Sequence, residues 1–212
     1  MKLLLAVCLT CALLYSAESL HCHVCNNEIC SNSSSVLCPA TSTVCRTLTS
    51  VRLSQSAPSV TVNKSCSSLL SCASPLNIET EWSMNRGFLR EAHNQICCIT
   101  DNCNFPTLAI PNILTNGKQC PSCASPADSL AGTCNVTLSC MGVEDSCFNG
   151  TTTSNSMEAL QLGCVSGNLC GIQAALEAML GADIIKITCG APWSVRISTV
   201  LLIFALTAQA LV

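Results

Sequence analysis

Cysteine constrains the fold of this chain more than any other residue, because it occupies 20 of the 212 positions. Aromatic residues make up only 3% of the sequence, so the chain lacks the large side chains that dominate the burial of most protein cores. Small extracellular domains that cannot build a sufficient core are held together by disulfides instead. The composition therefore predicts a small, disulfide-rich fold in an oxidising compartment.

Residues 1–19 have the features of a secretory signal peptide. Lys2 supplies a positive charge, residues 3–14 are apolar, and small residues precede a cleavage site after Ser19. A helix of about twelve apolar residues covers little more than half of a ~30 Å hydrocarbon core, which argues against a membrane anchor at this end. Cleavage removes two of the 20 cysteines and leaves 18 in the exported chain.

Residues 191–212 resemble the propeptide signal for attachment of a glycosylphosphatidylinositol (GPI) anchor. Gly190 and the next residue are small, residues 192–199 form a spacer, and residues 200–212 are apolar to the last position. A membrane-spanning helix, the alternative, needs about 20 apolar residues and is normally followed by cytoplasmic Lys or Arg. We therefore expect a lipoprotein anchored through Gly190 to the extracellular face of the cell membrane.

Two series of cysteines divide the exported chain into two similar units, which we interpret as a repeat. Intervals of two, six and five residues between cysteines recur in the same order in both series. The units span residues 20–104 and 119–190, and residues 105–118, with two prolines and an Asn-Gly pair, form the predicted linker. The first series consists of Cys22, Cys25, Cys30, Cys38, Cys45, Cys66, Cys72, Cys97, Cys98 and Cys103, and the second of Cys120, Cys123, Cys134, Cys140, Cys147, Cys164, Cys170 and Cys189.

Two pairs with C-x-x-C spacing, which begin at Cys22 and Cys120, are also compatible with zinc ligation or with redox catalysis. The cysteine count is even, however, and no histidine follows at a ligand spacing, so structural disulfides are the better interpretation. We expect neither a metal nor a cofactor. Each disulfide that closes a loop of about 15 residues stabilises a fold by about 3 kcal/mol.

Both ends of the first unit resemble the urokinase-receptor and lymphocyte-antigen-six family. The opening segment, LHCHVC at residues 20–25, and the closing segment, CCITDNCN at residues 97–104, are similar to the signatures of that family. The resemblance covers nearly all of residues 20–190 and implies a mainly β fold of two tandem three-finger (snake-toxin-like) domains. The second unit departs from the pattern, because it lacks the final C-C-x4-C-N and ends at Cys189.

The resemblance also implies a disulfide pairing, which the spacing alone leaves open among hundreds of connectivities. In the first domain it joins Cys22 to Cys45, Cys25 to Cys30, Cys38 to Cys66, Cys72 to Cys97 and Cys98 to Cys103. In the second domain it joins Cys120 to Cys147, Cys123 to Cys134, Cys140 to Cys164 and Cys170 to Cys189.

Two β-hairpins are predicted in the first domain. Residues 44–53 and 60–65 are rich in Val, Thr and Leu and flank a polar tip, so they form the second finger. The third finger covers residues 74–96, with its tip at residues 84–87. Three residues around this tip, Trp82, Arg86 and Phe88, are our candidates for ligand contact, because buried aromatic and Arg side chains often carry interface energy. The alternative is that the rings cover the sheet and stiffen the finger.

In the second domain, apolar residues recur at helical spacing over residues 172–180, between two glycines. This pattern predicts a short helix that packs against its own sheet. Residues 183–188 then form the strand that returns to Cys189.

Four N-glycosylation sequons begin at Asn32, Asn63, Asn135 and Asn149. They predict exposed positions in a glycoprotein, and we expect at least two of them to carry glycan.

Charge and motifs exclude two classes of function. The chain has 9 basic and 12 acidic residues and a net charge of -3, without a Lys/Arg run, so we expect no nucleic-acid partner. No nucleophile or metalloprotease motif occurs. The adjacent carboxylates Glu144 and Asp145 are predicted to point to opposite faces of a strand, which is unsuitable for an acid/base pair. We therefore expect that the protein is not an enzyme.

These features favour a GPI-anchored cell-surface glycoprotein that binds an extracellular or cell-surface protein ligand, as a receptor or adhesion module, through its three-finger domains. The alternative is a secreted inhibitor of phospholipases, because two-unit gamma-type phospholipase inhibitors share the resemblance. A purely structural coat protein is a third hypothesis.

Overall fold

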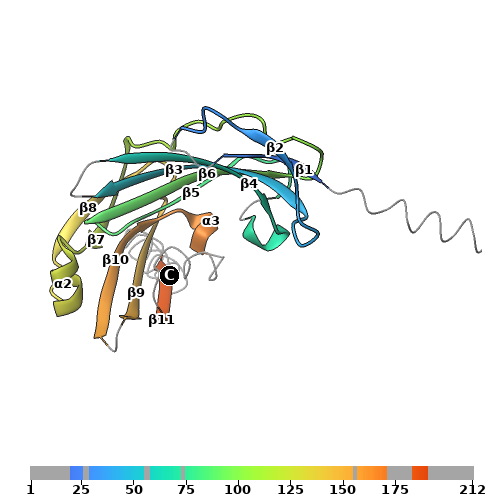
Figure 1. Cartoon of the computed structure of the whole chain (residues 1–212). Helices are drawn as coiled ribbons and strands as arrows, with labels where there is room; N and C mark the ends of the chain where they lie inside the picture. Colours follow the sequence, from blue (N-terminus) through green and yellow to red (C-terminus); the bar gives the residue numbers. More distant parts are fainter. Residues whose placement is uncertain are drawn as a thin grey trace, which may run out of the picture. The chain divides into compact units, whose positions relative to one another are not determined.

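The computed structural model describes residues 20–25, 29–54, 58–72, 75–154, 157–170 and 183–190 (Figure 1). The predicted signal peptide, the predicted anchor signal and the helix predicted over residues 172–180 lie outside these residues. The described part of the chain is small, mainly β and rich in disulfides, as the sequence predicts. The arrangement as two tandem three-finger domains stays a prediction.

Strands make up most of the described elements. The strands are β1 (His21–Val24), β2 (Ser34–Leu37), β3 (Val44–Ser54), β4 (Ser59–Ser67), β5 (Thr80–Asn85), β6 (Leu89–Cys98), β7 (Thr115–Ser122), β8 (Val136–Met141), β9 (Ser146–Ser154), β10 (Met157–Val165) and β11 (Asp183–Gly190). The helical turns are η1 (Leu69–Ser71), α2 (Pro126–Ala131) and α3 (Gly167–Cys170). The strands predicted for the second finger and for the return to Cys189 are confirmed as β3, β4 and β11.

The hydrogen-bonded strand order is β11-β9-β10-β5-β6-β3-β4 in the largest sheet, and β1-β2 and β7-β8 form separate pairs. Contacts between residues divide the chain into two compact units, which we call the first and second unit from here on and whose bounds differ from those of the two sequence repeats. The first comprises residues 1–48, 61–79 and 95–108, and the second comprises residues 49–60, 80–94 and 109–212. The outer parts of both hairpins of the predicted first domain thus group with the second unit, and residues 115–118 of the predicted linker belong to β7.

The segment predicted as the third finger forms a hairpin of β5 and β6, but its turn lies further along the chain than predicted. Met84 and Asn85 still belong to β5, and the turn consists of residues 86–88. The backbone N–H of Arg86 donates to the carbonyl of Leu89 at 2.8 Å and closes the turn. The difference arises because Met84 and Asn85 continue the sheet, where they pair with Val165 and Cys164 of β10.

Nine disulfides cross-link the described cysteines, and they are the same nine pairs that the family resemblance implies. In the first unit they form the core itself, in which Cys22, Cys38, Cys45 and Cys98 pack together as one buried cluster. Cys25 and Cys30 form a second cluster with Val62.

The first unit is also held by the buried side chain of Asn104, the last residue of its closing segment. The Nδ2 atom of Asn104 donates to the carbonyls of His23 and Arg46, at 2.8 and 3.1 Å, and Oδ1 accepts from the N–H of His23 at 2.9 Å. One amide side chain therefore joins β1 to β3, and aspartate at this position would lose both donated hydrogen bonds.

The second unit combines a disulfide cluster with a small apolar core. Cys120, Cys140 and Cys164 form the sulfur cluster. The apolar core consists of Met84, Phe148, Val165 and Leu169. A glycine lets two strands of this unit approach, since a Cβ on Gly163 would lie 1.9 Å from the carbonyl oxygen of Asn85.

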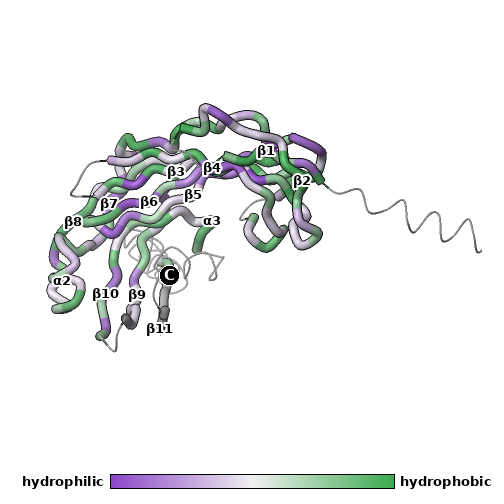
Figure 2. The backbone as a smooth tube through the Cα atoms, in the orientation of Figure 1, coloured by the Kyte–Doolittle hydropathy of each residue, from purple (hydrophilic) through white to green (hydrophobic). Residues whose placement is uncertain are grey.

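The strands alternate in hydropathy over short distances (Figure 2), and several inward positions are polar. Thr47 and Thr49 of β3 are buried, as are Arg90 and Asn94 of β6. Buried polar groups are costly unless they are hydrogen-bonded, so a core of this kind depends on specific partners as well as on disulfides.

Exposure of the four sequons predicts which of them carry glycan. Asn32, Asn135 and Asn149 are exposed, whereas Asn63 is half-buried and its Oδ1 atom is buried, with no hydrogen-bond partner among the residues described. We expect glycans at the three exposed positions and none at Asn63. Each single Asn→Gln substitution should speed migration on a denaturing gel, except Asn63→Gln, and a mobility change with Asn63→Gln would contradict the assignment.

Candidate functional site

A cavity of about 220 Å³ lies in the second unit, at the turn between β5 and β6. Four of its lining residues are apolar and come from three elements or turns: Leu53, Phe88, Leu138 and Met141. Arg90 of β6 adds a charged group to this lining. Concave, mostly apolar cavities with a few placed polar groups are typical of binding sites.

The turn that presents Phe88 is fixed against β7. Gly87 has φ +87°, and a Cβ there would lie 2.3 Å from Oγ of Ser122 and 2.5 Å from the carbonyl oxygen of Cys123. Ser122 Oγ donates to the carbonyl of Arg86 at 2.9 Å. Only glycine satisfies both the left-handed backbone and the close approach to β7, so residue 87 determines how close the turn lies to that strand.

Arg90 is held at the cavity by a buried ion pair. Its Nε donates to Oε1 of Glu144 at 2.6 Å, and its Nη2 donates to the carbonyl of Asn112 at 2.9 Å. The Arg90 and Glu144 side chains are only 2% and 0% exposed. The second carboxylate oxygen of Glu144 accepts from the N–H of Met141 at 2.8 Å. This network fixes the guanidinium, yet Nη1 of Arg90 is buried and has no hydrogen-bond partner in the part of the chain that the structure describes.

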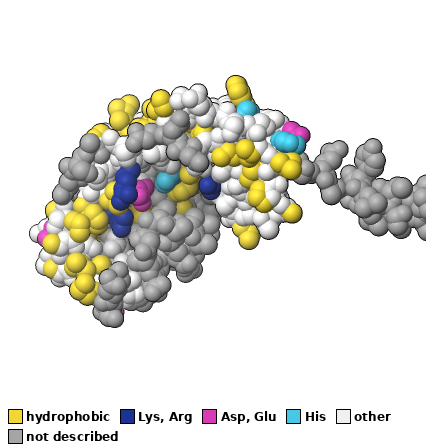
Figure 3. All heavy atoms as spheres, in the orientation of Figure 1, with side chains coloured by type: hydrophobic (Ala, Val, Ile, Leu, Met, Phe, Trp, Pro, Cys, Tyr) yellow, Lys and Arg dark blue, Asp and Glu magenta, His cyan; other side chains and the backbone are white. Residues whose placement is uncertain are grey.

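Charged side chains also gather around the turn. Arg86 lies over the ring of Phe88, 5.4 Å from its centroid. Burial lowers the pKa of Arg86, nearby Glu91 opposes that shift, and nearby Arg52 adds to it. Arg52 and Glu91 form an ion pair at 3.6 Å. Figure 3 shows Lys and Arg side chains gathered beside acidic ones on the face in view.

The structure separates the three predicted contact residues. Arg86 and Phe88 lie together at the turn, where Phe88 lines the cavity. Trp82 instead stacks on His93, with ring centroids 4.1 Å apart, and packs against the apolar core of the second unit. Trp82 therefore covers the sheet, as the alternative interpretation predicts, while Phe88 and Arg86 remain candidates for ligand contact.

Sequence reasoning missed Arg90, Leu138 and Met141. One signal was available, because Arg90 follows Phe88 by two residues and precedes Ala92 by two, which places a charge on the inward face of a strand. An arginine side chain that points into the protein is rarely buried unless it is paired with an opposite charge or a hydrogen-bond acceptor. That partner is Glu144, 54 residues away, and nothing in the sequence pairs the two. Glu144 and Asp145 were predicted to lie on a strand, but they lie in the connection between β8 and β9, where Glu144 is buried and Asp145 is exposed.

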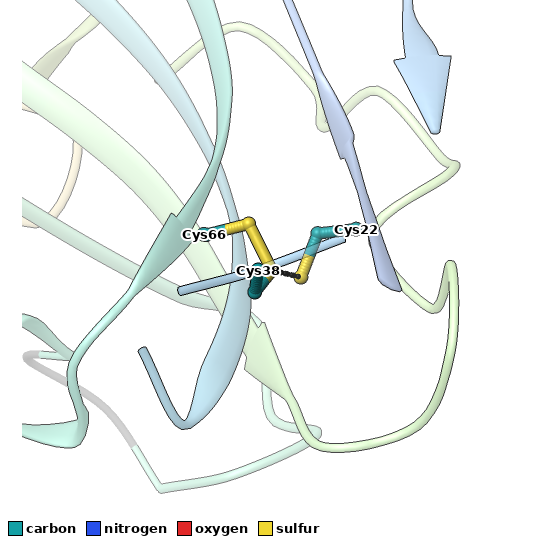
Figure 4. Close-up of side chains that lie close together, drawn as sticks. All are labelled: Cys22, Cys38 and Cys66. Carbon is teal, nitrogen blue, oxygen red and sulfur yellow. Dashed lines mark hydrogen bonds between the residues drawn. A yellow bond between two sulfur atoms is a disulfide. The ribbon is translucent and has the colours of Figure 1, made fainter. Parts of the chain in front are cut away.

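Two groups of three cysteines have sulfur atoms within 4.8 Å of one another, as metal ligands do. One group is Cys22, Cys38 and Cys66 (Figure 4), and Cys120, Cys140 and Cys164 form the corresponding group in the second unit. All six sulfurs belong to disulfides. Metal ions bind thiolates, so in the oxidised protein these groups are points where two disulfides pack against each other.

No model of a known protein family matches this chain, and no curated protein sequence matches it either. The family resemblance therefore stays a prediction. Among the described residues, no helix has the length and apolar character needed to cross a membrane.

Removing the charge of Arg90 should destabilise the second unit strongly. Arg90→Ala leaves the Glu144 carboxylate buried and unpaired, and breaking such a pair costs about 3–5 kcal/mol. Replacing both partners, as Arg90→Met with Glu144→Leu, should cost less than Arg90→Ala alone. The measurement is guanidinium unfolding of the disulfide-bonded protein, followed by the fluorescence of Trp82.

The matched control is Arg52→Ala. The Arg52 side chain is 60% exposed and its partner Glu91 is 23% exposed, so we expect a loss of at most about 1 kcal/mol. Equal small losses of stability for Arg90→Ala and Arg52→Ala would show that the Arg90–Glu144 ion pair contributes no more to stability than an exposed pair.

Proposed function

We propose that this chain is a GPI-anchored cell-surface glycoprotein, built from two three-finger domains, that binds an extracellular or cell-surface protein ligand as a receptor or adhesion module. The observation that carries the proposal is the cavity at the β5–β6 turn, lined by Phe88 and Arg90 and flanked by Arg86. Aromatic and Arg residues around a desolvated pocket are the usual composition of an interface hot spot.

The disulfide scaffold supports this proposal energetically. Association costs free energy when side chains and loops become ordered at the interface, and a rigid site reduces that cost. Here the β5–β6 turn is closed by its own hydrogen bond and is tied to β7 through Ser122. Cys120 of the second sulfur cluster lies in β7 and is bonded to Cys147. The turn is therefore attached to a strand that a disulfide holds in place.

The proposed lipid attachment at Gly190 is compatible with the end of β11. Gly190 is exposed, and a Cβ at this position would meet no atom of the described residues within 4 Å. The preceding residue, Cys189, is bonded to Cys170. The lipid would therefore follow directly on a cross-linked strand, and confinement to a surface raises the effective concentration of weak contacts.

The anchor is tested on intact cells that express the protein. A phosphatidylinositol-specific phospholipase should release it into the medium, and Gly190→Trp should reduce its amount at the surface, because the attachment site requires a small residue. Retention on the cell after lipase treatment would reject the anchor, and spontaneous release with inhibition of a secreted phospholipase would favour the soluble inhibitor instead.

Ligand binding is tested with the lipase-released protein against a panel of extracellular proteins displayed on cells. We expect saturable binding to at least one of them, reduced roughly tenfold or more by Phe88→Ala or Arg86→Ala, because hot-spot truncations cost more than about 2 kcal/mol. Phe105→Ala is the matched control, since Phe105 is 68% exposed and lies in the first unit. A complete absence of saturable partners would leave the structural coat protein as the better hypothesis.

A further inference from the structure

We propose that the cavity at the β5–β6 turn receives one large apolar side chain of the protein ligand, and that Nη1 of Arg90 donates a hydrogen bond to a peptide carbonyl beside that side chain. This inference rests on the proposed function, because it assumes that the ligand is a protein. The inference extends the proposed function by naming the chemical class of the ligand group that enters the cavity.

The volume of the cavity limits the occupant to a single side chain. An engineered protein cavity of about 150 Å³ accepts benzene, so a cavity of about 220 Å³ accommodates an aromatic ring or a branched aliphatic side chain. Sites for drug-sized molecules begin near 300 Å³. The apolar lining by Leu53, Leu138 and Met141 favours a hydrocarbon group.

The buried guanidinium specifies a hydrogen-bond acceptor next to that group. Two of the three nitrogens of Arg90 are engaged, Nε by Glu144 and Nη2 by Asn112, whereas Nη1 has no hydrogen-bond partner among the described residues. A buried donor without a partner is destabilising, and more so when the donor is charged. A ligand acceptor on Nη1 recovers that free energy, which makes Arg90 a specificity-determining residue as well as a structural one.

The charge balance favours a neutral acceptor. Glu144 already compensates the charge of Arg90 at 2.6 Å, so an added carboxylate would leave one negative charge in excess inside the second unit. A peptide carbonyl accepts the same hydrogen bond without adding a charge.

Access to Nη1 requires a small movement of the cavity wall, because this atom has almost no exposed surface. Arg86 lies over the ring of Phe88, which lines the cavity, with its guanidinium carbon 5.4 Å from the ring centroid.

The experiment uses the mature glycoprotein labelled with ¹³C-methyl methionine, with N-acetyl-phenylalanine N-methylamide and N-acetyl-leucine N-methylamide as probes. Both contain an apolar side chain beside peptide carbonyls. We expect them to shift the NMR signal of Met141, which lines the cavity, and to leave that of Met157, which is 57% exposed and outside the lining, unchanged. N-acetyl-alanine N-methylamide, which lacks the large side chain, should not shift Met141.

Two variants, measured by saturation-transfer NMR on the phenylalanine probe, test the residues directly. Met141→Trp fills the cavity and should abolish binding, whereas Met157→Trp is the matched control and should not. Arg90→Lys keeps the positive charge beside Glu144 but removes the guanidinium, including Nη1, and should weaken binding roughly tenfold, the size of one charge-assisted hydrogen bond of about 1.4 kcal/mol. An unchanged signal of Met84, which is buried in the apolar core of the second unit, verifies that the variant is folded.

Three results would overturn the inference: no shift of Met141 up to the solubility limit of either probe, equal binding by wild type and Met141→Trp, or preferential binding of octanoate, which would indicate a fatty-acid site. The proposed function has a separate readout. If displayed proteins bind and Met141→Trp leaves that binding unchanged, the cavity assignment fails and the receptor proposal stands. If the probes bind and no displayed protein does, the receptor proposal fails.

Discussion

Covalent cross-links between cysteines are the constraint on which the rest of this structure depends. Eleven of the twenty buried hydrophobic residues in the described part of the chain are half-cystines, so sulfur fills the positions that Leu, Ile and Phe take in ordinary cores. A disulfide stabilises chiefly by restricting the unfolded chain, and it does so whatever the strands beside it are made of. The strands therefore do not need a continuous apolar face to keep the fold stable.

Because the disulfides supply this stability, the interior of the protein tolerates polar side chains. Thr47, Asn104 and the pair Arg90–Glu144 are all nearly inaccessible, and a buried ion pair contributes little net stability compared with apolar residues of the same size. The ion pair instead fixes the positions of three segments, because the guanidinium of Arg90 connects β6 to the loop at Asn112 and to the carboxylate of Glu144 beside β8. The network also places Arg90 in the lining of the cavity at the β5–β6 turn.

The sequence predicted what depends on local pattern. The strands of the second finger follow from Val and Thr content, and the exported, cross-linked character follows from cysteine number. The third finger was predicted as a hairpin, but its turn was misplaced because pairing of Met84 and Asn85 with β10 is a long-range property. The partner of Arg90 was beyond reach for the same reason, because Glu144 lies 54 positions away in the sequence.

The two units close differently, and the difference bears on how a tethered site works. The first unit contains the Cys98–Cys103 disulfide and the Asn104 side chain that joins β1 to β3, whereas the last described strand of the second unit, β11, ends with Gly190 paired to Cys147 in β9. From there β9 pairs with β10, and β10 pairs with β5, the strand that leads into the cavity turn. If Gly190 carries the lipid, the tether reaches the cavity through hydrogen-bonded strands alone. A site held in this way loses little orientational freedom on binding at a surface, which raises its effective concentration toward a ligand on the same or a facing membrane.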